Sequence, residues 1–103
     1  MKSRILDRVK MARRLTTDAF DDELNDLIEE GAADLGVVGI DCGEINGGQV
    51  RPLIMRAVVT YCCLNFGSPE NYDKLKASYD EQKAQLQMAT GYGLPEEGAE
   101  NGL

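Results

Sequence analysis

The feature that most constrains this chain is a pair of segments with opposite polarity, separated by a glycine-rich stretch. Residues 17–36 are acidic, and their apolar residues recur every three or four positions. Residues 51–67 are apolar around most of a helical circumference. Helices of this kind bury their apolar surface by packing on other helices. We therefore predict an all-α fold in which the helix over 51–67 is central.

Four helices are expected in total. One side of the first helix is apolar and consists of Ile5, Leu6, Val9 and Ala12. The charged residues point away from it: Arg4, Asp7, Arg8, Lys10 and Arg14. Ser3 is the expected N-cap. The second carries Phe20, Leu24, Leu27, Ile28, Gly31 and Leu35 at helical spacing. Thr17 or Asp18 is its predicted N-cap, and Gly36 its left-handed stop.

The third and fourth helices have proline at their predicted starts. Pro52 suits the first turn of the third helix, which continues to Gly67. Ser68 and Pro69 are the predicted cap and first-turn proline of the fourth helix, which extends to about Met88. Its narrow stripe consists of Tyr72, Leu75, Tyr79, Gln82 and Leu86. Because polar Gln82 interrupts this stripe, we expect the fourth helix to be more exposed than the third.

Two segments lack helical periodicity. Residues 36–50 contain five glycines, which predicts a long loop. A short hairpin within this loop, around the sequence EINGGQV, is an alternative that we keep open. From residue 90 onward, glycine, proline and glutamate dominate, and such a tail cannot bury enough surface to order itself. We expect one helical domain over residues 1–90 and a flexible tail over residues 91–103, since 103 residues support a single modest core.

Charge is unevenly distributed along the chain. The formal net charge is −7, with six basic residues in 1–14 and ten acidic residues, with no basic one, in 18–44. A protein with this balance is poorly suited to hold nucleic acid through phosphate contacts, which need Lys and Arg. Only the basic first helix is an exception.

The residue types needed for several kinds of catalysis are missing. Without histidine, no Ser/His or Cys/His nucleophile pair can be built, and the glycines match neither GxxxxGK[ST] nor GxGxxG. Acidic helices could hold Mg²⁺, as in small all-α nucleotide pyrophosphohydrolases, but the facing helix Pro52 to Phe66 carries no Asp or Glu. The acids also lack EF-hand spacing. We expect no enzyme activity, no metal and no cofactor.

The three cysteines indicate a reducing compartment. Cys62 and Cys63 are adjacent on the apolar helix, where thiols usually pack as small hydrophobes, and no CxxC pair suggests zinc. No signal-peptide core is visible, and the longest uncharged run, residues 57–69, is shorter than the ~20 residues that span a bilayer. We expect a soluble intracellular protein without membrane contact.

Acidic side chains of the second helix have no basic neighbours in sequence to compensate them. Asp18, Asp22, Asp26 and Glu30 lie four apart, and like charges at this spacing repel by about 0.2–0.5 kcal/mol per pair. Glu29, Glu30 and Asp34 also lie at the unfavourable end of the helix dipole. We predict contacts between Arg4, Arg8, Arg13 or Arg14 and Asp22, Asp26, Glu29 or Glu30, within one chain or between subunits. The alternative is a simply solvated acidic face.

The order of these segments resembles the small helical head-to-tail connector (adaptor) proteins of tailed phages and prophages, often described as DNA-packaging proteins. The resemblance is carried by LDRVKMARRLTTDAFDDELNDLIEEGAADLG, PLIMRAVVTYCCLNFG and SPENYDKLKASYDEQKAQL, which together span roughly residues 4–88. It rests on helix order and apolar spacing rather than on a single motif.

The resemblance implies a virion protein of the head-tail junction that is made in the host cytoplasm. Such subunits form a ring beneath the portal, twelve-fold if it matches the portal, and can be monomeric before docking. The ring extends the DNA channel, lets DNA pass without specific binding, and docks tail-completion proteins. We expect Gly91, Tyr92 and Leu94 to anchor the tail on the portal protein. The alternative to this function is a small helical regulator that binds another protein without catalysis.

Overall fold

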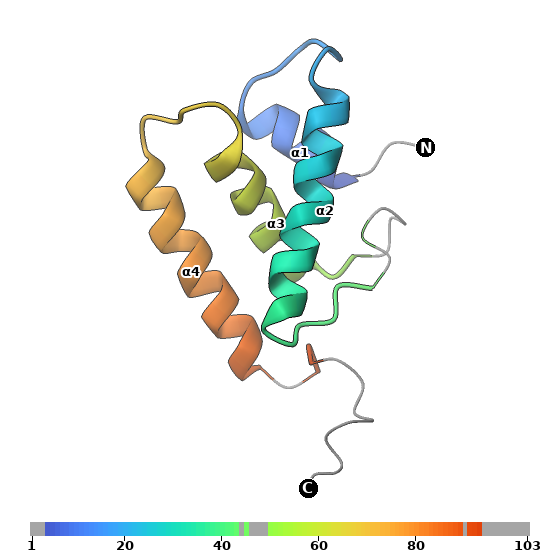
Figure 1. The fold of residues 1–103 in the computed structure, drawn as a ribbon, viewed down its shortest axis with the longest axis vertical. Coiled ribbons are helices and arrows are strands. Elements are labelled where there is room, and N and C mark those ends of the chain that lie inside the picture. The colour runs from blue at the N-terminus through green and yellow to red at the C-terminus, as the bar shows by residue number, and fades with distance from the viewer. Residues whose placement is uncertain (1–3, 44, 46–49, 90, 94–103) are drawn as a thin grey trace, which may run out of the picture.

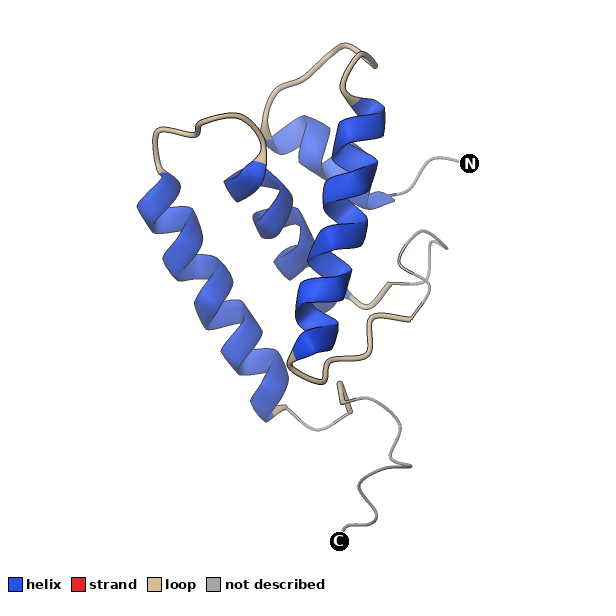
Figure 2. Ribbon diagram, viewed as in Figure 1, coloured by secondary structure: helices blue, strands red, loops and turns tan. Residues whose placement is uncertain are grey.

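The computed structural model describes residues 4–43, 45, 50–89 and 91–93. It contains four helices, α1 (Arg4–Ala12), α2 (Asp21–Val37), α3 (Pro52–Asn65) and α4 (Tyr72–Met88) (Figure 1). Within these described ranges, the only β pairing is an isolated bridge between Ile40 and Gly93, and Figure 2 accordingly shows helices joined by loops. The predicted all-α class with four helices is confirmed.

Helix α3 is the centre of the fold. It packs against α1, α2 and α4, and α1 also packs against α2. The buried side of α3 includes Ile54, Val58 and Cys62, each almost fully removed from solvent. Pro52 occupies the first turn, where its missing N–H costs no helical hydrogen bond. The central position predicted from the apolar circumference of this segment is therefore confirmed.

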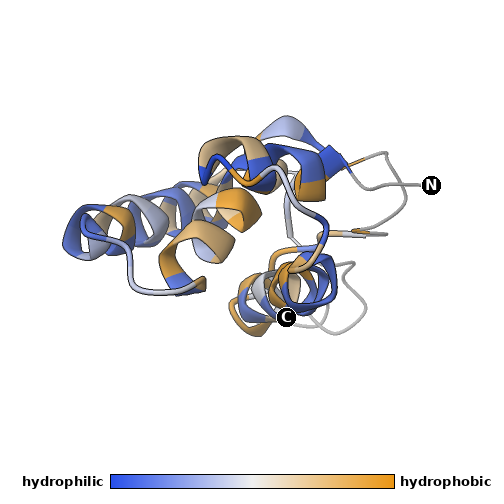
Figure 3. Cartoon of the chain, turned by 90° about the horizontal axis from the view of Figure 1, so that it is seen from above, coloured by the Kyte–Doolittle hydropathy of each residue, from blue (hydrophilic) through white to orange (hydrophobic). Residues whose placement is uncertain are grey.

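Helix α4 is shorter than predicted. It begins at Tyr72, with Asn71 as N-cap, so the predicted start at Ser68 and Pro69 is wrong. After α3 the chain turns through Gly67, whose φ of +66° lies in the left-handed region, and residues 67–71 are needed to reverse its direction. In the stripe, Tyr79 and Leu86 are buried, whereas Tyr72 is exposed. In Figure 3, α4 is largely hydrophilic and α3 mostly hydrophobic, which confirms that α4 is the more exposed helix.

Helix α2 begins and ends later than predicted. Its first residue is Asp21, and its N-cap is Phe20, which makes no side-chain capping bond. Thr17 instead accepts a hydrogen bond from the Ala19 N–H (3.1 Å), and Asp18 pairs with Lys10. The predicted caps Thr17 and Asp18 therefore lie in the preceding turn.

The C-terminal stop of α2 is Gly39, not Gly36. Gly36 is helical, whereas Gly39 has a φ of +89°. The Gly39 N–H donates to the Gly36 carbonyl (3.0 Å) and the Ile40 N–H donates to the Leu35 carbonyl (3.1 Å). These two bonds form a Schellman motif, and the side chains of Ile40 and Leu35 are both buried in the core, as is usual for this motif. The helix passes Gly36 because only the later glycine allows Ile40 to return to the core.

Helix α1 buries Ile5, Leu6 and Val9 as predicted, but two other residues differ. Ala12 is exposed, because α1 ends there and the chain turns away. Lys10, predicted to point away, is 8% exposed. Its stem crosses toward the start of α2, where Nζ lies 2.7 Å from Asp18 and 2.8 Å from Asp21. A lysine can bury its methylene stem while its ammonium pairs with carboxylates.

The long connection between α2 and α3 covers residues 38–51. The predicted hairpin around residues 44–50 falls mainly on residues outside the described ranges, as does Ser3, the predicted cap of α1.

Arg14 is the one described non-glycine residue with positive φ (57°). A side chain with a Cβ costs energy in this left-handed conformation, which glycine adopts freely. We expect Arg14→Gly to raise the free energy of unfolding by up to about 1 kcal/mol in urea denaturation. Arg14→Ala, which keeps the Cβ, should show no such gain, and a glycine variant no more stable than the alanine variant would contradict the explanation.

Candidate functional site

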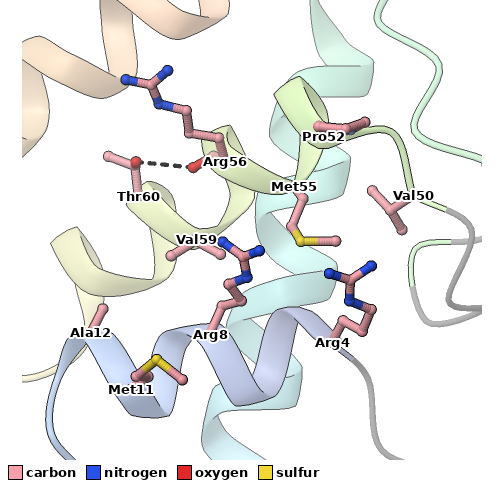
Figure 4. Close-up of a pocket in the computed structure, with 10 residues that line it drawn as sticks. All are labelled: Arg4, Arg8, Met11, Ala12, Val50, Pro52, Met55, Arg56, Val59 and Thr60. Carbon is pink, nitrogen blue, oxygen red and sulfur yellow. Dashed lines mark hydrogen bonds between the residues drawn. The ribbon is translucent and has the colours of Figure 1, made fainter.

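A groove of about 510 Å³ lies between α1 and α3 and is open enough to receive another segment (Figure 4). We call it the arginine groove. Its lining residues are Arg4, Arg8, Met11, Ala12, Val50, Pro52, Met55, Arg56, Val59 and Thr60. Those from α1 are at positions 4, 8, 11 and 12, and those from α3 at 52, 55, 56, 59 and 60, so each helix contributes one face.

The arginine groove combines an apolar floor with a cationic rim. Figure 4 shows Arg4 and Arg8 extending from α1 toward α3, with Met55 and Val59 between the helices, while Arg56 leaves the α3 side. Three arginines and no acidic residue are among its lining residues. Within the described part of the chain, none of these three arginines forms an ion pair. The groove therefore suits a segment that carries both apolar and acidic side chains.

A second surface of opposite charge lies on α2. Asp22, Asp26 and Glu29 are exposed and lie on the side opposite the buried residues Leu24, Ile28 and Leu35. The same exposed line continues through Ala33 to Val37, which is 83% exposed. We call these five residues the acidic face. Its acids turn away from the core of their own subunit, which leaves them available to a neighbouring molecule.

The contacts predicted between arginines of α1 and acids of α2 do not form within one chain. In the described ranges, no ion pair joins Arg4, Arg8, Arg13 or Arg14 to Asp22, Asp26, Glu29 or Glu30. Arg13 instead donates to the carbonyls of Cys63 (2.8 Å) and Phe66 (2.7 Å). Glu30 accepts a hydrogen bond from the Tyr61 hydroxyl (2.8 Å). The version between subunits stays a prediction.

Lys10 makes the ion pairs that join α1 to the start of α2. The hydrogen bond to Asp18, followed by that to Asp21, raises the pKa of Lys10. Because this folded-state pKa lies above the ordinary value of 10.5, the stabilisation is fully present below pH 10.5 and is lost as pH rises through the raised pKa. The lysine was missed at the sequence level because helical periodicity places position 10 beside the solvent-facing charges.

A polar cluster joins α2 to α4. The Tyr79 hydroxyl donates to Asp34 (2.5 Å), and Lys83 Nζ lies 3.1 Å from the same carboxylate oxygen. The hydrogen bond from Tyr79 is the main cause that lowers the pKa of Asp34 below 3.8. Burial, followed by the bond to Asp34, raises the pKa of Tyr79. This cluster compensates Asp34, one of the acids that has no basic neighbour in sequence.

Removing the Tyr79 hydroxyl tests this cluster. We expect Tyr79→Phe to lower the free energy of unfolding by about 1 kcal/mol at neutral pH, because Asp34 is partly exposed and water replaces part of the lost bond. The lowered pKa of Asp34 contributes stability above pH 3.8 that is lost as pH falls through the folded-state pKa. The difference between variant and parent in urea denaturation should therefore shrink below that pH. A difference independent of pH would contradict this assignment.

The cysteines show no sign of nucleophilic activation. Burial raises the pKa of Cys62 to about 12 and also raises the pKa values of Cys63 and Cys42. All three are free thiols, and Cys62 and Cys63 pack in the core as predicted. In the ranges described, no group of three or more Cys, Asp or Glu side chains is placed to hold a metal ion.

Residues 91–93 return to the body of the protein. Arg51 donates to the Gly91 carbonyl (2.6 Å), and its guanidinium lies 4.1 Å from the centre of the Tyr92 ring. The Asp41 N–H donates to the Tyr92 carbonyl (2.8 Å), next to the bridge between Ile40 and Gly93. We call these contacts the Arg51 clasp. Of the residues predicted to bind the portal, Gly91 and Tyr92 are in the clasp, and Leu94 lies outside the described residues.

The helical fold and its two charged surfaces define a small all-α protein whose surface suits contacts with other macromolecules. The family model for phage connector proteins matches residues 5–93, and the chain belongs to this family. The match covers all four helices and ends at the last residue of the Arg51 clasp. The comparisons with curated proteins and with solved structures found no match. No helix in the described ranges is long and apolar enough to cross a membrane.

Proposed function

We propose that this protein is a structural subunit of the phage head-tail connector, which assembles into a ring on the portal, extends the DNA channel and docks tail-completion proteins. The family supports a structural role in the phage particle. The observation that carries the finer proposal is that the arginine groove and the acidic face are complementary in charge but do not meet within one subunit.

Two different complementary surfaces on one subunit favour head-to-tail association. Each copy presents the acidic face to one neighbour and basic α1 residues to the other, and such contacts close into a ring when the rotation permits. In this proposal Arg4, Arg8, Arg13 and Arg14 lie on one side of the contact, and Asp22, Asp26, Glu29 and Glu30 on the other. Arg13 and Glu30 already have partners in their own chain, so Arg8 and Asp26 are the more informative pair to change.

The net negative charge supports the passage of DNA without specific binding. A chain with charge −7 repels phosphates over most of its surface, and a conduit must not hold the DNA in place.

The proposed contact with the portal is made by Gly91, Tyr92 and Leu94. To form it, Tyr92 would leave Arg51 and bind a residue of the portal protein instead. Deleting residues 91–103 should then abolish portal binding while the far-UV circular dichroism spectrum stays helical. Unchanged binding would discard this part of the proposal.

The test of ring assembly is negative-stain microscopy of the protein mixed with portal protein. We expect a ring on the portal, which is lost in Asp26→Arg and in Arg8→Asp but restored in the double variant, because the exchange recreates the ion pair. Lys74→Glu on the exposed side of α4 is the matched charge control and should leave the ring intact. Molar NaCl should weaken the contact between subunits. A ring unaffected by salt and by either reversal would remove the electrostatic mechanism.

A further inference from the structure

We propose that residues 94–103 bind in the arginine groove of their own chain. The proposal concerns a contact within a single subunit, and it does not depend on the ring or the portal. It rests on the position at which the described chain leaves the fold, on the composition of the following ten residues, and on groove arginines that form no ion pair with any described residue.

The Arg51 clasp places the start of this segment at one end of the groove. Arg51 holds Gly91 and Tyr92, and its two neighbours in the chain, Val50 and Pro52, both line the groove. Gly93 is bridged to Ile40, so the chain leaves the described structure close to that end. Arg4 lies at the same end, near Val50 in Figure 4.

Ten residues are long enough to cover the groove. An extended chain spans at most about 3.3–3.6 Å per residue, which gives roughly 33 Å for residues 94–103. Along α1 the groove extends from Arg4 to Ala12, about 12 Å at the helical rise of 1.5 Å per residue. The segment can therefore cross the remaining distance and still lie along the floor.

The chemistry of the segment matches the groove. Residues 94–103, LPEEGAENGL, contain three glutamates, two leucines and no basic residue. The groove offers three arginines on its rim and the apolar Met55 and Val59 on its floor. The lysines of α4 are weaker candidates, because Lys76 already pairs with Asp80 and Lys83 with Asp34, and Lys74 is a single exposed cation that lines no groove with other arginines or lysines in the described residues. Glutamates near Arg4, Arg8 and Arg56 with leucines over Met55 satisfy both parts of the groove.

Occupation of the groove would also regulate association. Arg4 and Arg8 cannot pair at the same time with residues 94–103 and with the acidic face of another copy. A partner that takes residues 94–103 out of the groove would free these arginines. This regulation, unlike the groove contact itself, rests on the proposed contact between subunits: residues 94–103 keep a subunit from associating until they are bound elsewhere.

The methionine methyl groups allow a direct test. We would record NMR spectra of the full chain and of residues 1–93, which retain all described residues, with ¹³C-methyl methionine. The Met11 and Met55 signals should shift on truncation, while Met88, exposed on α4, should not. The shifts should be independent of protein concentration. Unchanged Met11 and Met55 signals would overturn the proposal, and a dependence on concentration would assign the groove to a second copy instead.

Binding in trans gives the second measurement. A fluorescent peptide of residues 94–103 should bind the truncated chain, and Arg8→Glu should weaken binding at least tenfold, whereas Lys74→Glu should change it less than twofold. Equal effects of the two reversals would refute a specific groove contact. Short duplex DNA should bind no better to the truncated chain than to its Arg8→Glu variant. DNA binding that needs Arg8 and is the same with and without the tail would show a polyanion site and overturn the proposal.

Discussion

Replacing Ile28 with alanine is expected to lower the free energy of unfolding by about 2–5 kcal/mol. Ile28 is fully buried in the middle of α2, on the side that packs against α3. The substitution removes three carbons and leaves a cavity that rigid neighbouring helices fill only in part. Because small domains are stable by about 5–15 kcal/mol, this single change would remove a large share of the total. Urea denaturation followed by circular dichroism gives the value.

The matched control for this variant lies on the same helix. Val37 is 83% exposed, so Val37→Ala should change stability by less than about 0.5 kcal/mol. Because alanine has a higher helix propensity than isoleucine or valine, a loss at Ile28 no larger than that at Val37 would contradict the packing role assigned to Ile28.

Replacing Arg13 with alanine is expected to cost about 2 kcal/mol, because its guanidinium closes the end of α3. It donates to the carbonyls of Cys63 and Phe66 and lies 5.3 Å from the centre of the Phe66 ring. Hydrogen bonds with a charged partner contribute about 1.5–3 kcal/mol when shielded, and here the side chain is half-buried. Arg13→Lys should recover less than half of the loss, because an ammonium lacks the planar fork that reaches both carbonyls.

Arg14 provides the control for charge and position. It is adjacent in sequence and exposed, and Arg14→Ala keeps its Cβ in the same left-handed backbone conformation. We expect its free energy of unfolding to change by less than about 0.5 kcal/mol. If Arg13→Ala and Arg14→Ala were equally destabilising in thermal denaturation, the loss of one positive charge would explain both effects better than the loss of the hydrogen bonds of Arg13.

The fold could be predicted because the apolar spacing of each helix reports directly which side is buried. The 51–67 segment shows this most clearly, since a helix apolar on nearly all sides must have neighbours on nearly all sides. The helix ends were harder to predict, because they depend on contacts outside the local sequence. Either Gly36 or Gly39 could end α2, because both are glycines. The helix ends at Gly39 because this position lets Ile40 pack in the core.

The charged surfaces could be predicted only in part. The acidic face follows from periodicity, but the arginine groove requires knowing that Arg56 of α3 lines the same groove as Arg4 and Arg8 of α1. Lys10 shows the same limit, because its pairing with Asp18 and Asp21 is set by the turn between α1 and α2 rather than by helical spacing. The partners of Arg13 lie 50 and 53 residues away in the chain, and no short-range pattern indicates them.

The Arg51 clasp has a mechanical consequence. Arg51 immediately precedes α3 and is the N-cap of that helix, so its side chain links residues 91–93 to the helix on which all the others pack. A pulling force on the C-terminal segment would therefore act on the first turn of α3 through the Arg51 guanidinium, in addition to the backbone contacts at Asp41 and Ile40. Strain at this point would reach the core without first unwinding α4.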